Sequence, residues 1–137
     1  MPFQSRAAIL FNPDPVAYLP HRYPFLMLDR ILEHLPGSSA RARYRTSASL
    51  QQFPQVLLVE AVAQLSGVAA VQQEGEGGFL AAVEQARFGR PPQLGETLDV
   101  SARIVKSFGR LCLVEGQVMV AGEELLSVTL TLGIGSL

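Results

Sequence analysis

The chain has 137 residues, of which 48% are apolar and only 17% are charged. Globular proteins average about 25% charged residues, so this composition excludes intrinsic disorder and indicates extensive burial. The net charge of −1 provides no basic field for nucleic acid or an acidic membrane, and a single cysteine, Cys112, excludes an internal disulfide. We predict one domain over residues 1–137, and with no visible targeting or spanning segment the cytoplasm is the default location.

The first part of the chain predicts a short helix and then two strands. Asp14 and Pro15 are the residue types of a helix cap and a first helical position, so we predict a short helix over residues 16–19. Residues 25–35 and 40–49 have strand patterns and are separated by a Pro-Gly turn signal, which allows them to pair as a hairpin.

Residues 54–73 form the one long predicted helix. Its apolar side chains cover almost the whole circumference, which is typical of a helix buried on all sides. The remaining strands are predicted from alternating apolar residues, at residues 79–88, 97–104, 112–120 and 126–132. One buried helix and about six strands predict an α+β domain whose antiparallel sheet curls around the helix.

Glu60 is the first candidate for chemistry, because it interrupts the apolar helix. A carboxylate in such a place loses hydration, so we expect its pKa to rise until it can act as a general acid. Gln64 lies one turn later on the same face and can orient it. The alternative is that Glu60 and Gln64 form a buried structural pair that is satisfied by backbone groups.

The start of the predicted helix is the second candidate. Phe53 cannot cap it, so the backbone N–H groups of Val56 and Leu57 are expected to be free for a carbonyl or an anion. Water or a nearby loop is the alternative acceptor. His21 and His34 are the only histidines, and neither has metal-ligand spacing; His34 is expected at the surface and His21 in a packing role. No metal or redox cofactor is therefore expected.

Three segments of the chain resemble the bacterial 3-hydroxyacyl-acyl-carrier-protein dehydratases, which are hotdog-fold enzymes of fatty-acid synthesis. The segments are YLPHRYPFLMLDR at residues 18–30, PQVLLVEAVAQ at residues 54–64, and ARFGRP followed by LGE at residues 86–91 and 94–96. The resemblance covers nearly the whole chain. It implies a hotdog fold, in which a curled antiparallel sheet wraps around the long helix.

The resemblance also implies an active site that is shared across a dimer. In the family, a histidine from a Gly-His-Phe-Pro-Gly loop removes the proton next to the thioester. The helix carboxylate, matched here by Glu60, handles the departing hydroxyl. A glycine at the helix start, matched here by Gln55, gives a backbone N–H to the thioester carbonyl. The implied substrate-binding residues are Gln64, Gln55, Val56 and Phe53.

The chain departs from this pattern just before the helix. Residues 47–54 read SASLQQFP, which is shorter than the family loop and contains neither its histidine nor its glycine. Loss of a positioned base forfeits about 10²–10⁴ in rate, so we expect the homomer to be a poor dehydratase.

Three functions remain open on these grounds. The chain can be a dehydratase with a substitute base such as His21, or a hotdog acyl thioesterase in which Glu60 activates water or attacks directly. It can also be a non-catalytic subunit that binds acyl carrier protein or pairs with an active paralogue. The expected partners are thus acyl carrier protein or a coenzyme A thioester, and the expected assembly is a homodimer, a trimer of dimers or a heteromer.

Carrier proteins are acidic, so recognition of one requires a basic patch. The candidate cations lie near the third predicted long strand and its neighbours, and they are Arg87, Arg90, Lys106 and Arg110. The alternative is that these residues are solvated charges at strand edges.

Overall fold

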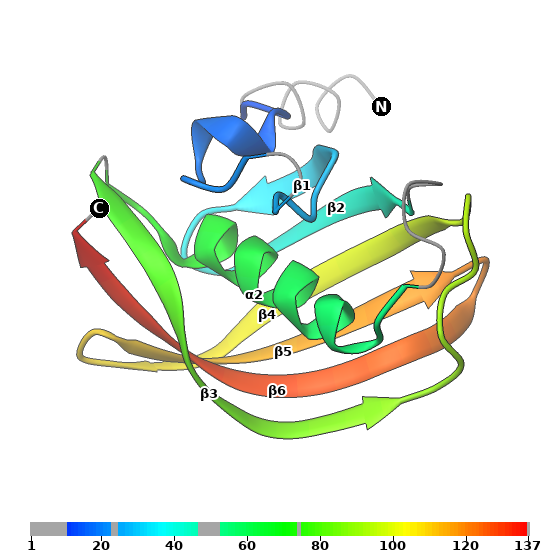
Figure 1. Ribbon diagram of the computed structural model, residues 1–137. Coiled ribbons are helices and arrows are strands. Elements are labelled where there is room, and N and C mark those ends of the chain that lie inside the picture. The colour runs from blue at the N-terminus through cyan, green and yellow to red at the C-terminus, as the bar shows by residue number, and fades with distance from the viewer. Residues whose placement is uncertain (1–10, 23–24, 47–52, 74, 137) are drawn as a thin grey trace, which may run out of the picture.

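The computed structural model describes residues 11–22, 25–46, 53–73 and 75–136. Within them, a six-stranded antiparallel sheet of strand order β1-β2-β4-β5-β6-β3 curls around a single α-helix, α2 (Figure 1). The elements are η1 (Pro15–Ala17), β1 (Arg30–Leu35), β2 (Ser39–Arg45), α2 (Val56–Ala70), β3 (Glu76–Phe88), β4 (Thr97–Phe108), β5 (Leu111–Val120) and β6 (Glu123–Ser136). The predicted α+β hotdog architecture is confirmed.

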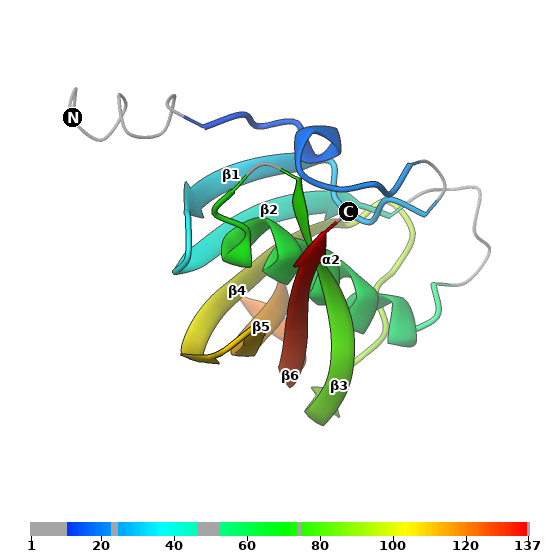
Figure 2. The ribbon, with the colours of Figure 1, turned by 90° about the vertical axis from the view of Figure 1, so that its left-hand side faces the viewer.

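The N-terminal segment lies over the open side of the curled sheet. Asp14 caps η1 as predicted, because its side chain accepts a hydrogen bond from the Val16 amide at 3.0 Å. This element is a 3-10 turn of three residues, shorter than the helix expected over residues 16–19. Figure 2 shows the segment next to β1 and β2, above α2.

The first predicted strand is five residues too long. It begins at Arg30 and not at residue 25, because the backbone groups of Phe25 and Met27 bond to the Gln64 side chain and not to a neighbouring strand. The second strand covers Ser39–Arg45, and residues 47–49 of its predicted range lie outside the described residues.

The long helix is buried on nearly all sides, as its sequence predicts. Twelve of its 15 residues are buried, and it packs against all six strands. It is shorter than expected at both ends, because Pro54 and Gln55 form a tight turn and Val71 adopts an extended backbone. Gly116 of β5 permits the close approach of the helix, since a Cβ there would lie 2.3 Å from a methyl group of Val62.

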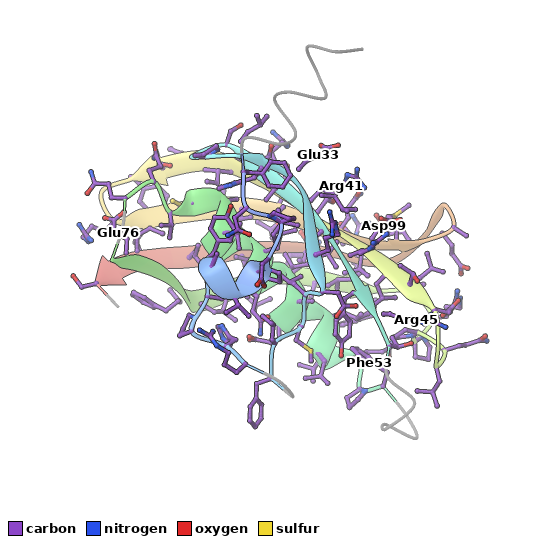
Figure 3. All side chains as sticks on the ribbon, turned by 90° about the horizontal axis from the view of Figure 1, so that it is seen from above. Glu33, Arg41, Arg45, Phe53, Glu76 and Asp99 are labelled. Atoms are coloured by element: carbon purple, nitrogen blue, oxygen red, sulfur yellow. The ribbon has the colours of Figure 1, made fainter. Side chains whose placement is uncertain are left out.

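The sheet has an apolar inner face and a polar outer face. The inner side chains of β4, β5 and β6 alternate as predicted and form most of the core around α2. On the outer face, Figure 3 shows Arg41 of β2 between Glu33 and Asp99, which its guanidinium meets at 3.2 and 3.6 Å.

β3 forms one edge of the sheet and is 13 residues long. It pairs only with β6 among the described strands, and its apolar side chains Leu80, Val83 and Phe88 are exposed. Long apolar edges are prone to pair with another chain, so this edge is a natural place for a subunit contact. No helix in the described ranges is long and apolar enough to cross a membrane.

Candidate functional site

The carboxylate of Glu60 and the amide of Gln64 form the centre of the candidate site. The two residues are one turn apart on α2, and the Gln64 Nε2 atom donates a hydrogen bond to Glu60 Oε2 at 2.8 Å. This contact is the one that their spacing predicts. The role of Gln64 as the residue that orients Glu60 remains a prediction, and this bond supports it.

Gln64 also fixes the segment that leads into β1. Its side chain is only 3% exposed, so each of its polar atoms needs a partner. Nε2 donates a second hydrogen bond to the Phe25 carbonyl at 2.9 Å, and Oε1 accepts one from the Met27 amide at 2.8 Å. One buried side chain thus holds both the carboxylate and the chain segment opposite it.

That segment brings His21 to the same carboxylate. The Nε2 atom of His21 lies 3.7 Å from Glu60 Oε2, and the two side chains are 32% and 41% exposed. The other ring nitrogen, Nδ1, has no accessible surface and no hydrogen-bond partner among the residues described. The sequence predicts a packing role for His21, with a substitute base as one open alternative, and the 38 residues between it and Glu60 contain no local signal of the contact.

The exposure of Glu60 differs from the expectation. The sequence predicts a carboxylate with little solvent contact, but the side chain is 41% exposed in the single chain. The carboxylate thus reaches the surface, although twelve of the 15 residues of α2 are buried. Because Gln64 bonds to one carboxylate oxygen and the side chain is partly exposed, Glu60 can contact a group of another molecule.

The start of α2 differs in part from the expectation. The Leu57 amide is not free, because it donates to the Pro54 carbonyl at 3.0 Å. The amides of Gln55 and Val56 have no acceptor within the described ranges. The Gln55 side chain donates a hydrogen bond to the Gly89 carbonyl at 2.8 Å.

Phe53 is not an accessible substrate contact in the single chain, which corrects the expectation. It is 2% exposed, and its ring lies 6.2 Å from that of Tyr44. Figure 3 places it next to the start of α2. Because the Phe53 side chain is apolar and lies just before α2, it packs into the core and anchors this end of the helix.

The four candidate cations do not form one patch, which corrects a second expectation. Arg87 of β3 pairs with Ser127 of β6. Lys106 of β4 pairs with Leu113 of β5, which in turn pairs with Thr131 of β6. The four residues from Ser127 to Thr131 correspond to about 13 Å along β6. Lys106 and Arg110 therefore belong to the opposite end of the sheet from Arg87 and Arg90.

Two of these cations are also neutralised within the chain. Arg90 forms two hydrogen bonds with Glu96, at 2.9 and 2.8 Å, and a third with Glu123 at 3.1 Å. Arg110 donates to the Ile134 carbonyl and lies 3.6 Å from Glu76. Arg87 and Lys106 have no ion pair among the described side chains, so a carrier-protein role is left to these two as a prediction.

The second histidine is not a simple surface residue either. His34 packs edge-on against Tyr18, with ring centroids 5.2 Å apart, and hydrogen-bonds to the backbone of Val68. Burial lowers the pKa of His34 below its ordinary value of 6.5. Val68 lies eight residues beyond Glu60, or about 12 Å along the helix, so His34 is remote from the carboxylate.

No protein-family model matches the chain. Curated relatives are nevertheless similar over most of its length. The 3-hydroxyacyl-[acyl-carrier-protein] dehydratase FabZ of Bacillus subtilis is 33% identical over 130 residues, which cover 85% of this chain and 92% of that protein. The protein of the same name from Roseiflexus castenholzii is 36% identical over 127 residues, which cover 79% and 89%.

Solved structures share the fold at lower identity. A chain of the dehydratase heterocomplex ApeI:P from Xenorhabdus doucetiae has a TM-score of 0.78 at 19% identity, covering 92% of this chain and 93% of that one. A hypothetical thioesterase from Streptococcus pneumoniae, solved with coenzyme A, has a TM-score of 0.65 at 14% identity and covers 77% and 84%. These likenesses identify the hotdog fold. With relatives above 30% identity over most of its length, the chain belongs to the 3-hydroxyacyl-[acyl-carrier-protein] dehydratase family.

Proposed function

We propose that this chain is the acid-bearing subunit of a dehydratase that converts a 3-hydroxyacyl thioester into a trans-2-enoyl thioester. In this proposal a partner subunit supplies the catalytic base. The observation that carries it is the oriented carboxylate of Glu60. Its Oε2 atom receives the Gln64 amide at 2.8 Å, and no described residue bonds to Oε1, which is left to face a substrate hydroxyl.

The proposed reaction needs an acid and a base on opposite sides of the acyl chain. The base removes a proton from the carbon next to the thioester, and the electron pair forms the new double bond as the C–O bond breaks. Protonated Glu60 transfers its proton to the departing hydroxyl, which leaves as water. The amides of Gln55 and Val56, which have no acceptor among the described residues, are placed at the helix start, where they can polarise the thioester carbonyl.

Neither histidine of the chain is placed to act as that base. His21 directs one nitrogen at Glu60 and has the other buried, and His34 is bound near the far end of the helix. The segment before α2 contains no histidine in the sequence. These facts favour a base from a second subunit over a substitute base within the chain.

The edge strand β3 and the exposed side of Glu60 support an assembly of two chains. Pairing along β3 would cover Leu80, Val83 and Phe88, which are otherwise exposed. An assembly of unlike chains fits best, because two copies of this chain would bring two acids and no base. The heterocomplex named among the structural neighbours is a precedent for such an assembly in a dehydratase.

The relatives support a choice of substrate class. The similar dehydratases act on acyl groups that are carried by acyl carrier protein, and some structural neighbours were solved with coenzyme A or acetyl coenzyme A. We therefore propose a 3-hydroxyacyl thioester as the substrate, with acyl carrier protein as the first carrier to test.

The test is a subunit complementation. The chain is co-expressed with an active dehydratase of its own organism whose helix glutamate has been replaced by glutamine, and the products of a 3-hydroxyacyl-carrier-protein thioester are separated by mass. We expect enoyl product from the pair, and loss of about 10²–10⁴ in rate when Glu60→Gln is introduced. Glu33→Gln, a surface carboxylate on β1, is the matched control and should keep the activity.

Other products would contradict the proposal in distinct ways. Enoyl product from the purified chain alone would mean that the chain has its own base. A free acid would assign it to the thioesterases. If no product forms with or without the co-expressed dehydratase, Glu60 has no acid function and the chain would be a binding subunit.

A further inference from the structure

We infer that His21 is a positioning residue for Glu60, with the tautomer of its neutral ring that carries the proton on Nε2, and is not the catalytic base. The inference rests on the proposed function, since it assigns a role at the same carboxylate. It makes a prediction about the ring of His21 that can be measured without substrate.

Two donors converge on a single oxygen of Glu60. Gln64 Nε2 lies 2.8 Å from Oε2, and His21 Nε2 lies 3.7 Å from the same atom. The second distance is longer than a direct hydrogen bond, and both side chains are partly exposed. Hydrogen bonds at catalytic groups are often long before substrate binds.

The buried nitrogen of His21 decides the tautomer. Nδ1 has no accessible surface and no acceptor among the residues described, so a proton on it would be a buried donor without a partner. An unpaired lone pair on the buried Nδ1 costs less free energy than an unpaired N–H donor at the same place. The neutral ring therefore keeps its proton on Nε2, which is the nitrogen that faces Glu60.

This tautomer excludes His21 as the base and gives it a different task. The lone pair of Nδ1 is buried, and Nε2 already carries a proton, so neither nitrogen can take a proton from a substrate. As a donor, Nε2 stabilises the Glu60 carboxylate after its proton has gone to the departing hydroxyl. Oε2 is then held by two donors, and Oε1 remains the reacting oxygen.

The backbone around His21 keeps the ring in place. Gln64 ties Phe25 and Met27 to α2, and the Arg22 guanidinium donates to the carbonyls of Leu19 and His21 at 2.6 and 2.8 Å. The contact to Glu60 thus depends on the fold of this segment and not on chance proximity of two long side chains.

The first test reads the tautomers of both histidines by long-range ¹H–¹⁵N correlation on the purified chain, at an alkaline pH at which imidazole rings are neutral. His34 is an internal control with the opposite expectation. Its Nε2 is buried without a partner, so the nitrogen that bonds to the Val68 backbone is Nδ1. We expect Nε2–H for His21 and Nδ1–H for His34. Nδ1–H or an even mixture at His21 would overturn the inference.

The second test uses two variants in the complementing pair described above. His21→Gln places an amide nitrogen near the position of Nε2, whereas His21→Asn is too short to reach Glu60. We expect His21→Gln to keep kcat near that of the original chain. His21→Asn should lower kcat about tenfold with KM little changed, which is the effect of one lost hydrogen bond to a charged group. Equal rates for all three chains, or equal losses in both variants, would refute the donor role.

The two proposals fail in different measurements. Absence of dehydration by every pair would count against the proposed function, and the tautomer of His21 would still stand as measured. An unexpected tautomer in an active pair would remove the role of His21 alone.

Discussion

Replacing Gln64 by methionine tests how much of the site is built by one buried side chain. Methionine has the same length and no branching, so the substitution removes the amide and leaves the volume nearly unchanged. Three hydrogen bonds are lost, from the Met27 amide, to the Phe25 carbonyl and to Glu60 Oε2.

The expected cost comes mainly from the Met27 amide. Met27 is 5% exposed, so its N–H is left buried without an acceptor, which costs about 1–3 kcal/mol. The Phe25 carbonyl belongs to an exposed residue and can turn to water. The bond to Glu60 is screened by solvent and adds less than about 1 kcal/mol. We therefore expect Gln64→Met to lower the free energy of unfolding by about 2–3 kcal/mol.

Equilibrium unfolding in urea at a fixed protein concentration measures this cost. With a typical slope of about 2 kcal/mol per molar, the midpoint should fall by about 1 M. Gln55→Met is the matched control, because it removes one hydrogen bond to the exposed Gly89 from the same helix and should cost less than about 1 kcal/mol. Equal midpoints for the two variants would refute the argument that the Gln64 bonds hold this segment.

Two further predictions concern the frame of the site. Gly116→Ala should lower the free energy of unfolding in urea by about 1–3 kcal/mol, because the alanine Cβ would clash with Val62. Adding Val62→Ala should restore part of this free energy, and a double variant without any recovery would contradict the steric cause. Hydrogen bonds from Arg90 and the Gln93 amide hold the pKa of Glu96 below its ordinary value of 4.5. The unfolded chain therefore binds more protons in acid, and the stability that the Glu96 carboxylate gives the folded chain is lost as the pH falls below about 4.5. Glu96→Gln should be less stable at pH 7 and converge with the original chain in acid, whereas an unchanged difference near pH 3 would contradict this linkage.

The proposed site combines a carboxylate that is bonded to the core with a partly exposed side chain. Gln64 donates a hydrogen bond to Glu60 from within the core, and the Glu60 side chain is 41% exposed in the single chain. In the proposed function, this arrangement suits a catalytic site that a second subunit completes. The exposed apolar residues of β3 would then give that subunit a surface to pair with.

Local patterns in the sequence predict most of the architecture. The apolar circumference of residues 54–73 predicts a buried helix, and strict alternation predicts β4, β5 and β6, because both signals depend only on the period of the backbone. The Glu60–Gln64 contact was predictable for the same reason, since residues four apart on a helix are neighbours. The family resemblance adds the order in which these elements wrap.

Contacts between distant segments were decided only by the tertiary structure. The sequence does not indicate that His21 meets Glu60, that Phe53 enters the core, or that Arg90 pairs with Glu123, 33 residues further along the chain. It also predicts a strand from residue 25, where the Gln64 side chain takes the backbone groups that a strand partner would use. The physical reason is common to all four cases: a polar or aromatic group takes the nearest partner in space, and that partner exists only after the sheet has closed around the helix.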